Sequence, residues 1–280
     1  MGVFHRIRPL AVVLSLAISV PAAAQSIKRG KTAGGIAYDV QGSGPVVVLL
    51  TGSNLDRRMW NREAEWLSKT CTVVRYDLRA HGESDTATTE FSHLKDLTGV
   101  LDTLKIQKAT LIGLSAGAFI ALDAALDIPD RVERVVLAGP GVSGYTGKVP
   151  PTFPPEMYTA IQAKEYRRVS EILLQSPVFA VAPESQALVR QMVTDNERLW
   201  TVDRALMKLQ PPTLGRLEQL RVPALVVVGE KDVFQQDHAE LIAARVSGAR
   251  LVRIPGGTHI VNLSSPKEFE AAVSAFLSGR

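Results

Sequence analysis

Short, largely apolar runs recur along the chain at wide spacing, and they are too short to be typical helices. These runs lie at residues 46–50, 72–76, 110–112, 135–138, 224–228 and 251–254. Continuous apolar runs of this length predict strands that are buried on both faces, as in a parallel sheet covered by helices. One further strand is predicted at 35–40, where apolar and polar residues alternate.

Helical patterns fill most of the gaps between these runs. Helices are predicted over 59–68, 91–104, 237–246 and 266–277, and Pro266 stands where the last one begins. Alternating buried strands and helices are typical of an α/β fold. The sequence therefore predicts a doubly wound, mostly parallel sheet.

Residues 143–212 interrupt this alternation because they contain no buried strand. The segment begins with a proline-rich loop and continues with helical patterns at 156–174, 184–195 and 196–209. A helical insertion after one strand of a regular sheet is best placed above the strand ends, where it covers a pocket. We therefore predict an α/β core formed by residues 25–142 and 213–280, with a helical cap formed by 143–212.

The first residues have the pattern of an export signal. Arg6 and Arg8 precede an apolar run at 10–20, and the small residues of 21–24 fit a signal peptidase site. The apolar run is much shorter than the ~20 residues that span a bilayer. Residues 1–24 are predicted to be a cleaved signal peptide, so we expect an exported protein, periplasmic or secreted, without a stable membrane anchor after cleavage.

Composition narrows the function classes. The chain has 280 residues, of which 46% are hydrophobic, so it can bury a large core. Its formal charge is +4, but the longest basic runs are the doublets Arg57-Arg58 and Arg167-Arg168, which argues against a nucleic-acid partner. Cys71 is the single cysteine, so an intramolecular disulfide is excluded. The oligomeric state is not indicated by the sequence.

The most specific chemical signal is the run Gly113-Leu114-Ser115-Ala116-Gly117. It follows a predicted strand and opens into a helical stretch, and a serine between glycines at such a turn is the pattern of a nucleophile elbow. A serine hydroxyl is a weak nucleophile at neutral pH and needs a base that is itself oriented by an acid. Ser115 is therefore the candidate nucleophile.

Chain order selects the candidate base and acid, since a serine elbow is followed by the acid and then by the histidine. His259 lies in a glycine-rich loop directly after the run 251–254, and Asp232 lies in the loop after 224–228. Glu230 and Asp237 are rivals for the acid. We interpret Asp237 as a helix N-cap, which leaves Asp232 as the leading candidate.

Other polar and aromatic residues are given structural interpretations. His81, together with Arg79, is expected to brace a turn near the pocket, and His93 is expected to be a solvated residue at a helix start. Trp200 is interpreted as core or cap packing. Met157, Met192 and Met207 fit either a pocket wall or ordinary packing.

A developing oxyanion requires backbone donors near the nucleophile. Ala116, directly after Ser115 at a helix N-terminus, supplies one N–H group. The loop after the first buried strand is Thr51-Gly52-Ser53-Asn54, and Ser53 is the candidate for the second donor.

Together these features resemble the α/β-hydrolase superfamily over about residues 27–280. The resemblance rests on the loop at Thr51, the turn Asp77-Leu78-Arg79-Ala80-His81-Gly82-Glu83-Ser84, the elbow at Ser115, and the loops of Asp232 and His259. Members most often carry His-Gly at the oxyanion loop, where this chain has Thr51-Gly52. The resemblance implies a serine hydrolase with no metal or organic cofactor, acting on a small carboxylic ester or lactone with an apolar acyl or alcohol group.

Several alternatives stay open on the sequence. Carbon–carbon bond hydrolases, iminopeptidases and perhydrolases of the same fold also keep a serine at the elbow. Haloalkane dehalogenases and epoxide hydrolases carry aspartate there, so Ser115 argues against both of these classes. A non-catalytic protein that binds a small ligand is another alternative. Thr51 is the one feature that favours it.

Overall fold

The computed structural model describes Gly2 and residues 26–149 and 153–279. The predicted signal peptide, Gly2 apart, lies outside the described residues, as do Pro150 and Pro151.

A single sheet of eight strands organises the described part of the chain, in the order β1-β2-β4-β3-β5-β6-β7-β8. The first two strands join antiparallel and all the others run parallel, which confirms the predicted fold class. The strands are β1 (Lys28–Lys31), β2 (Ala37–Gly42), β3 (Val46–Leu50), β4 (Thr72–Tyr76), β5 (Ala109–Leu114), β6 (Val132–Ala138), β7 (Ala224–Gly229) and β8 (Arg250–Ile254). The sequence did not predict β1, because Lys-Arg-Gly-Lys has neither an apolar run nor an alternation.

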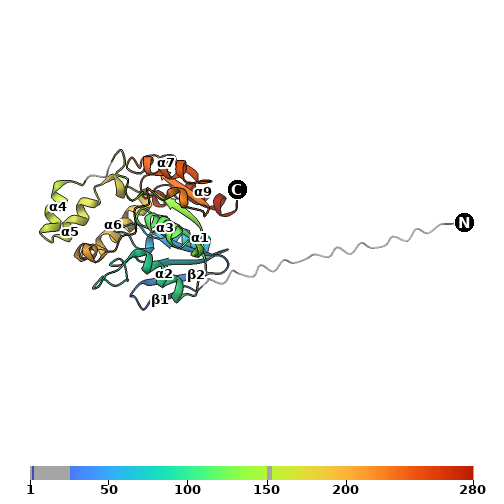
Figure 1. Ribbon diagram of the computed structural model, residues 1–280, viewed down its shortest axis with the longest axis horizontal. Coiled ribbons are helices and arrows are strands. Elements are labelled where there is room, and N and C mark those ends of the chain that lie inside the picture. The colour runs from blue at the N-terminus through green and yellow to red at the C-terminus, as the bar shows by residue number, and fades with distance from the viewer. Residues whose placement is uncertain (1, 3–25, 150–152, 280) are drawn as a thin grey trace.

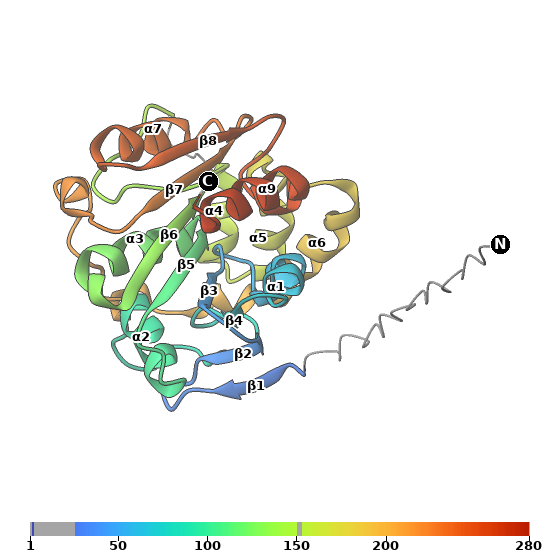
Figure 2. The same cartoon turned by 90° about the vertical axis from the view of Figure 1, so that its right-hand side faces the viewer.

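Helices cover both faces of the sheet, as Figure 2 shows. One face carries α1 (Asn61–Leu67), α8 (Val261–Ser264) and α9 (Pro266–Leu277), and the other carries α2 (His93–Thr103), α3 (Ala116–Asp127) and α7 (Gln236–Arg245). Successive residues of a strand point to opposite faces. Accordingly, Val47 and Leu49 pack in the core beneath α1 and α9, whereas Val48 and Leu50 pack in the core beneath α2 and α3. Short 3-10 helices lie at η1 (Arg57–Trp60), η2 (Pro129–Arg131) and η7 (Leu217–Gln219).

The described residues of the 143–212 segment form helices and loops, and the helices stand together beside the sheet in Figure 1. They are α4 (Pro155–Gln162), α5 (Tyr166–Leu173), α6 (Gln186–Asp195), η3 (Pro177–Phe179), η4 (Pro183–Ser185), η5 (Glu197–Thr201) and η6 (Arg204–Leu206). The division of the chain into a core and a cap stays a prediction.

Two helical predictions within this segment are wrong in detail. The helix expected over 156–174 is broken at Lys164, whose φ of 59° is left-handed and ends α4 before α5 begins. The helix expected over 196–209 is instead the pair η5 and η6. They are separated by Asp203, which has an extended backbone and accepts a hydrogen bond from the Ala205 N–H. Asp side chains that bond to the nearby backbone in this way compete with a continuing helix.

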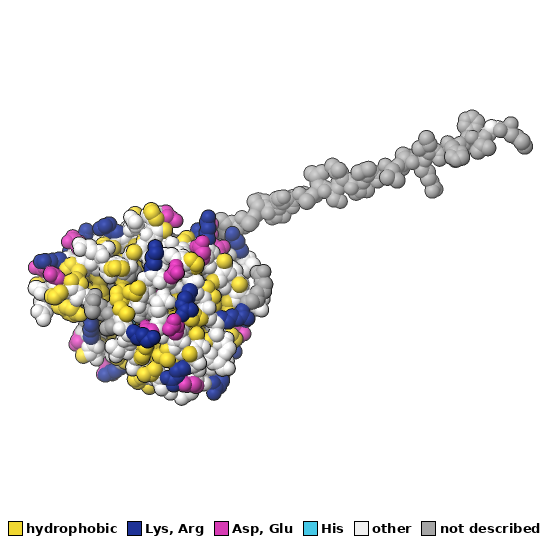
Figure 3. All heavy atoms as spheres, turned by 90° about the horizontal axis from the view of Figure 1, so that it is seen from above, with side chains coloured by type: hydrophobic (Ala, Val, Ile, Leu, Met, Phe, Trp, Pro, Cys, Tyr) yellow, Lys and Arg dark blue, Asp and Glu magenta, His cyan; other side chains and the backbone are white. Residues whose placement is uncertain are grey.

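The face seen in Figure 3 carries basic and acidic side chains interspersed, with no large area of one sign. Over the described residues, the structure contains no helix with the length and apolar character needed to cross a membrane.

Candidate active site

Ser115 lies at a strained turn between β5 and α3. Its φ of 52° is rare for a residue with a side chain and persists only where the surroundings enforce it. A side chain at Gly113 would overlap the Gly117 carbonyl group, and one at Gly117 would overlap the Leu50 carbonyl group. Both glycines are therefore sterically required, and the turn has the geometry of a nucleophile elbow.

Asp232 and His259 meet after neighbouring strands, β7 and β8, at the edge of the sheet where β5 also ends. The carboxyl ends of parallel strands share one edge, which brings distant loops together. His259 Nδ1 lies 2.8 Å from Asp232 Oδ2, and both residues are buried. Because a carboxylate can only accept, this bond places the proton on Nδ1 and leaves Nε2 as an acceptor.

The rival acids have other partners. Glu230 accepts a hydrogen bond from the Gly256 N–H at 3.0 Å. Asp237 binds the Tyr145 hydroxyl at 3.1 Å and the Lys148 N–H, so it holds the loop that begins the 143–212 segment. The interpretation of Asp237 as an N-cap is wrong, since Gln235 occupies that position of α7.

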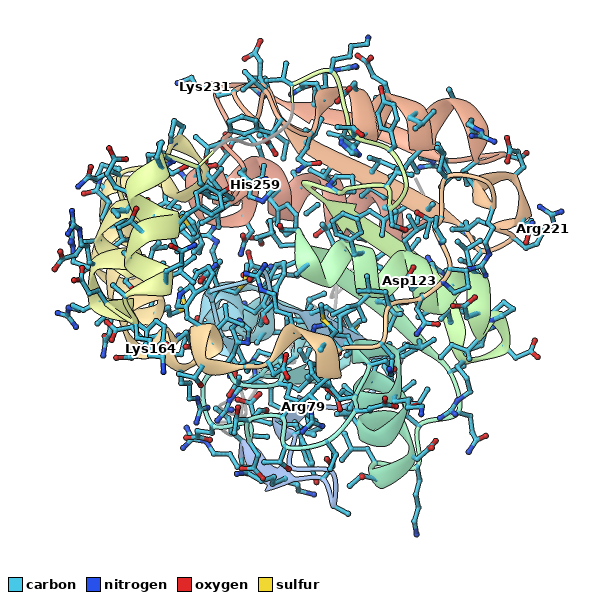
Figure 4. The ribbon with its side chains drawn as sticks, turned by 60° about the vertical axis from the view of Figure 1, so that its left-hand side comes forward. Arg79, Asp123, Lys164, Arg221, Lys231 and His259 are labelled. Atoms are coloured by element: carbon cyan, nitrogen blue, oxygen red, sulfur yellow. The ribbon has the colours of Figure 1, made fainter. Side chains whose placement is uncertain are left out.

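Ser115 and His259 line one cavity of about 490 Å³, here called the nucleophile cavity. Much of its wall comes from apolar side chains of the 143–212 segment, namely Phe153, Met157, Ile161, Leu173, Val178 and Phe179. In Figure 4, His259 lies between the core and helices α4 and α5, whereas Lys164 lies at the far end of that helix pair. A substrate at Ser115 would therefore contact an apolar wall.

A second cavity of about 590 Å³, here called the side cavity, adjoins the first. The two share the lining residues Ser53, Leu199, Trp200, Val202 and Arg204. Trp200 packs against the hydrophobic core, as the sequence predicts, and also lines both cavities. Of the three methionines, Met157 and Met207 line the cavities, whereas Met192 is fully buried.

Ser53 and Ala116 both line the side cavity, and Ser53 also lines the nucleophile cavity. Ala116 is the first residue of α3, where an N–H group has no acceptor within its own helix. Across residues 26–149 and 153–279, the backbone N–H groups of Ser53 and Ala116 have no hydrogen-bond acceptor. Free N–H groups at a helix N-terminus favour a negative charge.

His81 braces the loop that carries Ser53, in agreement with the sequence interpretation. Its Nδ1 lies 2.9 Å from the Arg79 carbonyl oxygen, and its Nε2 lies 3.1 Å from the Asn54 nitrogen. Because the carbonyl can only accept and the N–H can only donate, these two bonds require the neutral tautomer with the proton on Nδ1. Burial lowers the pKa of His81, which favours the same neutral form.

Two ionisable side chains that line the side cavity each have a buried polar atom without a hydrogen-bond partner. His93 lines the cavity and is partly exposed, but its Nδ1 is buried and burial lowers its pKa to about 4, so its interpretation as a solvated residue is only partly right. Asp123, on α3, has a buried Oδ1, and its pKa is raised to about 6 by burial and by the Asp127 carboxylate. Asp123 lies on α3, whereas Arg79, also labelled in Figure 4, lies in the turn after β4 and is paired with Asp96.

A metal centre is not evident in the part of the chain that the structure describes. Within residues 26–149 and 153–279, His, Cys, Asp and Glu side chains form no group of three that could hold an ion.

Comparison with known proteins gives a consistent family. A family model described as "Alpha/beta hydrolase family" matches residues 47–272. The enol-lactonase from Burkholderia xenovorans LB400 has a solved structure that is 25% identical, covers 90% of this chain and 100% of that chain, and superposes with a TM-score of 0.74. The hydrolase structure from Pseudomonas aeruginosa PA01 is 26% identical and covers 91% and 99% of the two chains, with a TM-score of 0.67. A curated relative from Burkholderia vietnamiensis, named 2-hydroxy-6-oxononadienedioate/2-hydroxy-6-oxononatrienedioate hydrolase, is 29% identical over 70% of this chain and 74% of its own.

Proposed function

The chain belongs to the alpha/beta hydrolase family, and from this premise we propose that it is a serine hydrolase of a carboxylic ester or lactone. One observation carries the proposal. The elbow serine, Ser115, lines the same cavity as His259, whose Nδ1 is bound by the buried carboxylate of Asp232. The enol-lactonase among the similar structures supports a lactone or ester as the substrate class.

In the proposed reaction, Ser115 Oγ attacks the substrate carbonyl carbon while His259 Nε2 accepts the hydroxyl proton. The carbonyl oxygen becomes an oxyanion that accepts hydrogen bonds from the N–H groups of Ser53 and Ala116. His259 then gives the proton to the leaving alcohol, and an acyl-enzyme remains. Water, deprotonated by His259, attacks that acyl-enzyme, and His259 returns the proton to Ser115 Oγ as the acid leaves, which regenerates the free hydroxyl. Asp232 keeps Nε2 in the accepting form throughout.

The walls of the two cavities indicate which chemical groups can lie on each side of the scissile bond. The nucleophile cavity is walled by apolar side chains, so an acyl or alcohol group that contacts this wall is apolar. The side cavity adjoins the donors Ser53 and Ala116 and has room for the group on the other side of the scissile bond.

The first experiment measures hydrolysis of p-nitrophenyl esters of increasing acyl length by the mature chain. Ser115→Ala should abolish turnover and labelling by a fluorophosphonate, whereas Ser278→Ala, which changes a serine at the end of α9, should leave both unchanged. Undiminished turnover by Ser115→Ala would refute the serine mechanism. Tight retention of a small molecule without turnover or labelling would favour the ligand-binding alternative.

The Burkholderia vietnamiensis relative justifies a comparison substrate of another kind. Its name identifies a 2-hydroxy-6-oxononadienedioate as the compound hydrolysed. We propose to measure kcat/KM for that compound beside the best ester and lactone. A preference for the dienedioate by more than about tenfold would move the assignment from ester to carbon–carbon bond hydrolysis.

Export stays part of the proposal because residues 1–24 have the pattern of a cleaved signal. Fractionation of cells that produce the full chain and a chain lacking residues 2–24 tests it. We expect the processed full chain outside the cytoplasm and the shortened chain inside it. Retention of both in the cytoplasm would contradict export.

A further inference from the structure

We propose that Asn196 and Arg198, at the end of α6 and in η5, are positioning residues that hold the oxyanion loop, Thr51–Asn54. On this inference, the 143–212 segment contributes to the chemical step and does more than cover the pocket. The inference rests on the proposed function, because it assigns a role to the Ser53 N–H group as an oxyanion donor.

Asn196 joins three parts of the chain through one buried amide, which is only 1% exposed. Its Nδ2 donates to Met192 O at 2.8 Å, to Asp56 Oδ2 at 3.1 Å and, more weakly, to Asn54 O at 3.4 Å. Its Oδ1 accepts from the Gly82 N–H at 2.7 Å. Buried partners left without this amide would each lose a hydrogen bond that water does not replace.

Asn54 is held by hydrogen bonds on both sides of its peptide unit. Its φ of 63° is left-handed, a region that asparagine tolerates better than most residues with side chains. His81 Nε2 accepts the Asn54 N–H, and the Asn196 amide binds the Asn54 carbonyl oxygen. The Asn54 N–H belongs to the peptide plane directly after Ser53, so its bond to His81 restrains the loop on that side of Ser53. The Ser53 N–H shares its own plane with the Gly52 carbonyl oxygen, which accepts from the Leu55 N–H at 3.3 Å.

Arg198 stabilises the turn that contains His81, which is the second contact of the oxyanion loop. Its guanidinium donates to the carbonyl oxygens of Ala80 at 3.2 Å, His81 at 3.1 Å and Ser84 at 2.7 Å, and also to that of Gly82. Hydrogen bonds from a charged donor are stronger than neutral ones. Arg198 therefore pins the turn that presents His81 to Asn54.

These contacts form one continuous hydrogen-bond network that restrains the oxyanion loop. It runs from the 143–212 segment, through the turn that contains His81, to the loop that contains Ser53. Weakening it should displace an oxyanion donor without altering the apolar wall of the nucleophile cavity. Transition-state binding should then suffer while ground-state substrate binding is kept.

The test compares Asn196→Ser and Arg198→Gln with wild type, using p-nitrophenyl butyrate as substrate and butylboronic acid as the transition-state analogue. Asp195→Asn is the matched control. Its carboxylate also joins the segment to the core, by a surface ion pair with Arg58, but it does not touch the loop or the turn. Circular dichroism melting verifies that every variant folds.

We expect kcat to fall about ten- to hundredfold in Asn196→Ser, somewhat less than the loss of a complete oxyanion donor. Butylboronic acid affinity should fall in parallel while KM changes by less than about twofold.

Folded variants with unchanged kcat, or with raised KM and unaltered boronic acid affinity, would overturn the inference. Either result would mean that the 143–212 segment only covers the pocket. Wild-type turnover that depends on Ser115 is established first. If it is absent, the proposed function fails, whereas if it is present and the variants keep their kcat, only the present inference fails.

Discussion

Glu63, a buried carboxyl in the first turn of α1, should make the protein less stable as the pH rises. It is 2% exposed, and its Oε2 has no hydrogen-bond partner. Burial raises its pKa from 4.5 to about 8, since an ionised carboxylate loses its hydration there. Replacement by glutamine keeps the size of the side chain and removes the titration.

The sign follows from the protons that each state binds. Below pH 4.5, Glu63 is protonated in both the folded and the unfolded chain, and the free energy of unfolding carries no penalty. Between pH 4.5 and 8 the unfolded chain releases the proton first, so stability falls by about 1.4 kcal/mol for each pH unit. Above pH 8 the loss levels off at about 5 kcal/mol, as expected for a folded pKa of about 8.

Urea denaturation of wild type and Glu63→Gln at pH 4.5, 6, 7.5 and 9 measures this difference. Glu63→Gln should match wild type at the lowest pH and gain stability progressively up to about pH 8. The control is Glu65→Gln, in the same helix but exposed, which should follow wild type throughout. An advantage of Glu63→Gln that is equal at all four pH values would refute the reasoning.

Three further outcomes are expected. Asp232→Asn should lower kcat by about 10⁴-fold in an ester assay with little change in KM, because the amide donates to His259 Nδ1 and stabilises the wrong tautomer; a loss below tenfold would contradict the acid's role. Asp123→Asn should lower KM for long-chain esters by roughly tenfold above pH 6, where the carboxyl is ionised, and should leave KM unchanged near pH 4.5; a pH-independent change would contradict a charge effect. Gly117→Ala should remove both activity and cooperative melting, since its methyl group would overlap the Leu50 carbonyl group; a folded and active variant would contradict the close approach.

Local composition explains which parts of the fold could be predicted. The strands at 46–50 and 72–76 have the bounds that the apolar runs predict, because burial on both faces requires such runs. By contrast, β1 is recruited by backbone pairing with β2 and leaves no hydrophobic signal. The stretch 196–209 has helical spacing, but Asp203 interrupts it by accepting the Ala205 N–H, and the side chains of Asn196 and Arg198 bind distant loops.

In the candidate site too, residues whose role depends on adjacent residues are predictable, whereas residues whose role depends on distant contacts are not. Ser115 is recognisable because the turn sterically requires glycine at positions 113 and 117, which lie close to Ser115 in the sequence. The place of His93 is not predictable from its neighbours, because Phe91 pairs with Met207 of the 143–212 segment and all three residues line the side cavity. Asp237 looked like a cap because a short polar residue begins a helix there, but its partners lie in a loop some ninety residues earlier.

Contacts from the 143–212 segment reach both sides of the candidate site, which limits how independent that segment is of the rest of the fold. Besides the bonds of Asn196 and Arg198, the Thr258 hydroxyl donates to Ala180 O at 2.6 Å, and the Ala182 N–H donates to Leu263 O, around the loop of His259. A chimera in which another protein's lid replaces residues 143–212 would lose these contacts as well as the walls of the pocket. Lid transplantation should therefore succeed only when the donor sequence supplies equivalents of these anchors, and library design for altered selectivity should hold them constant.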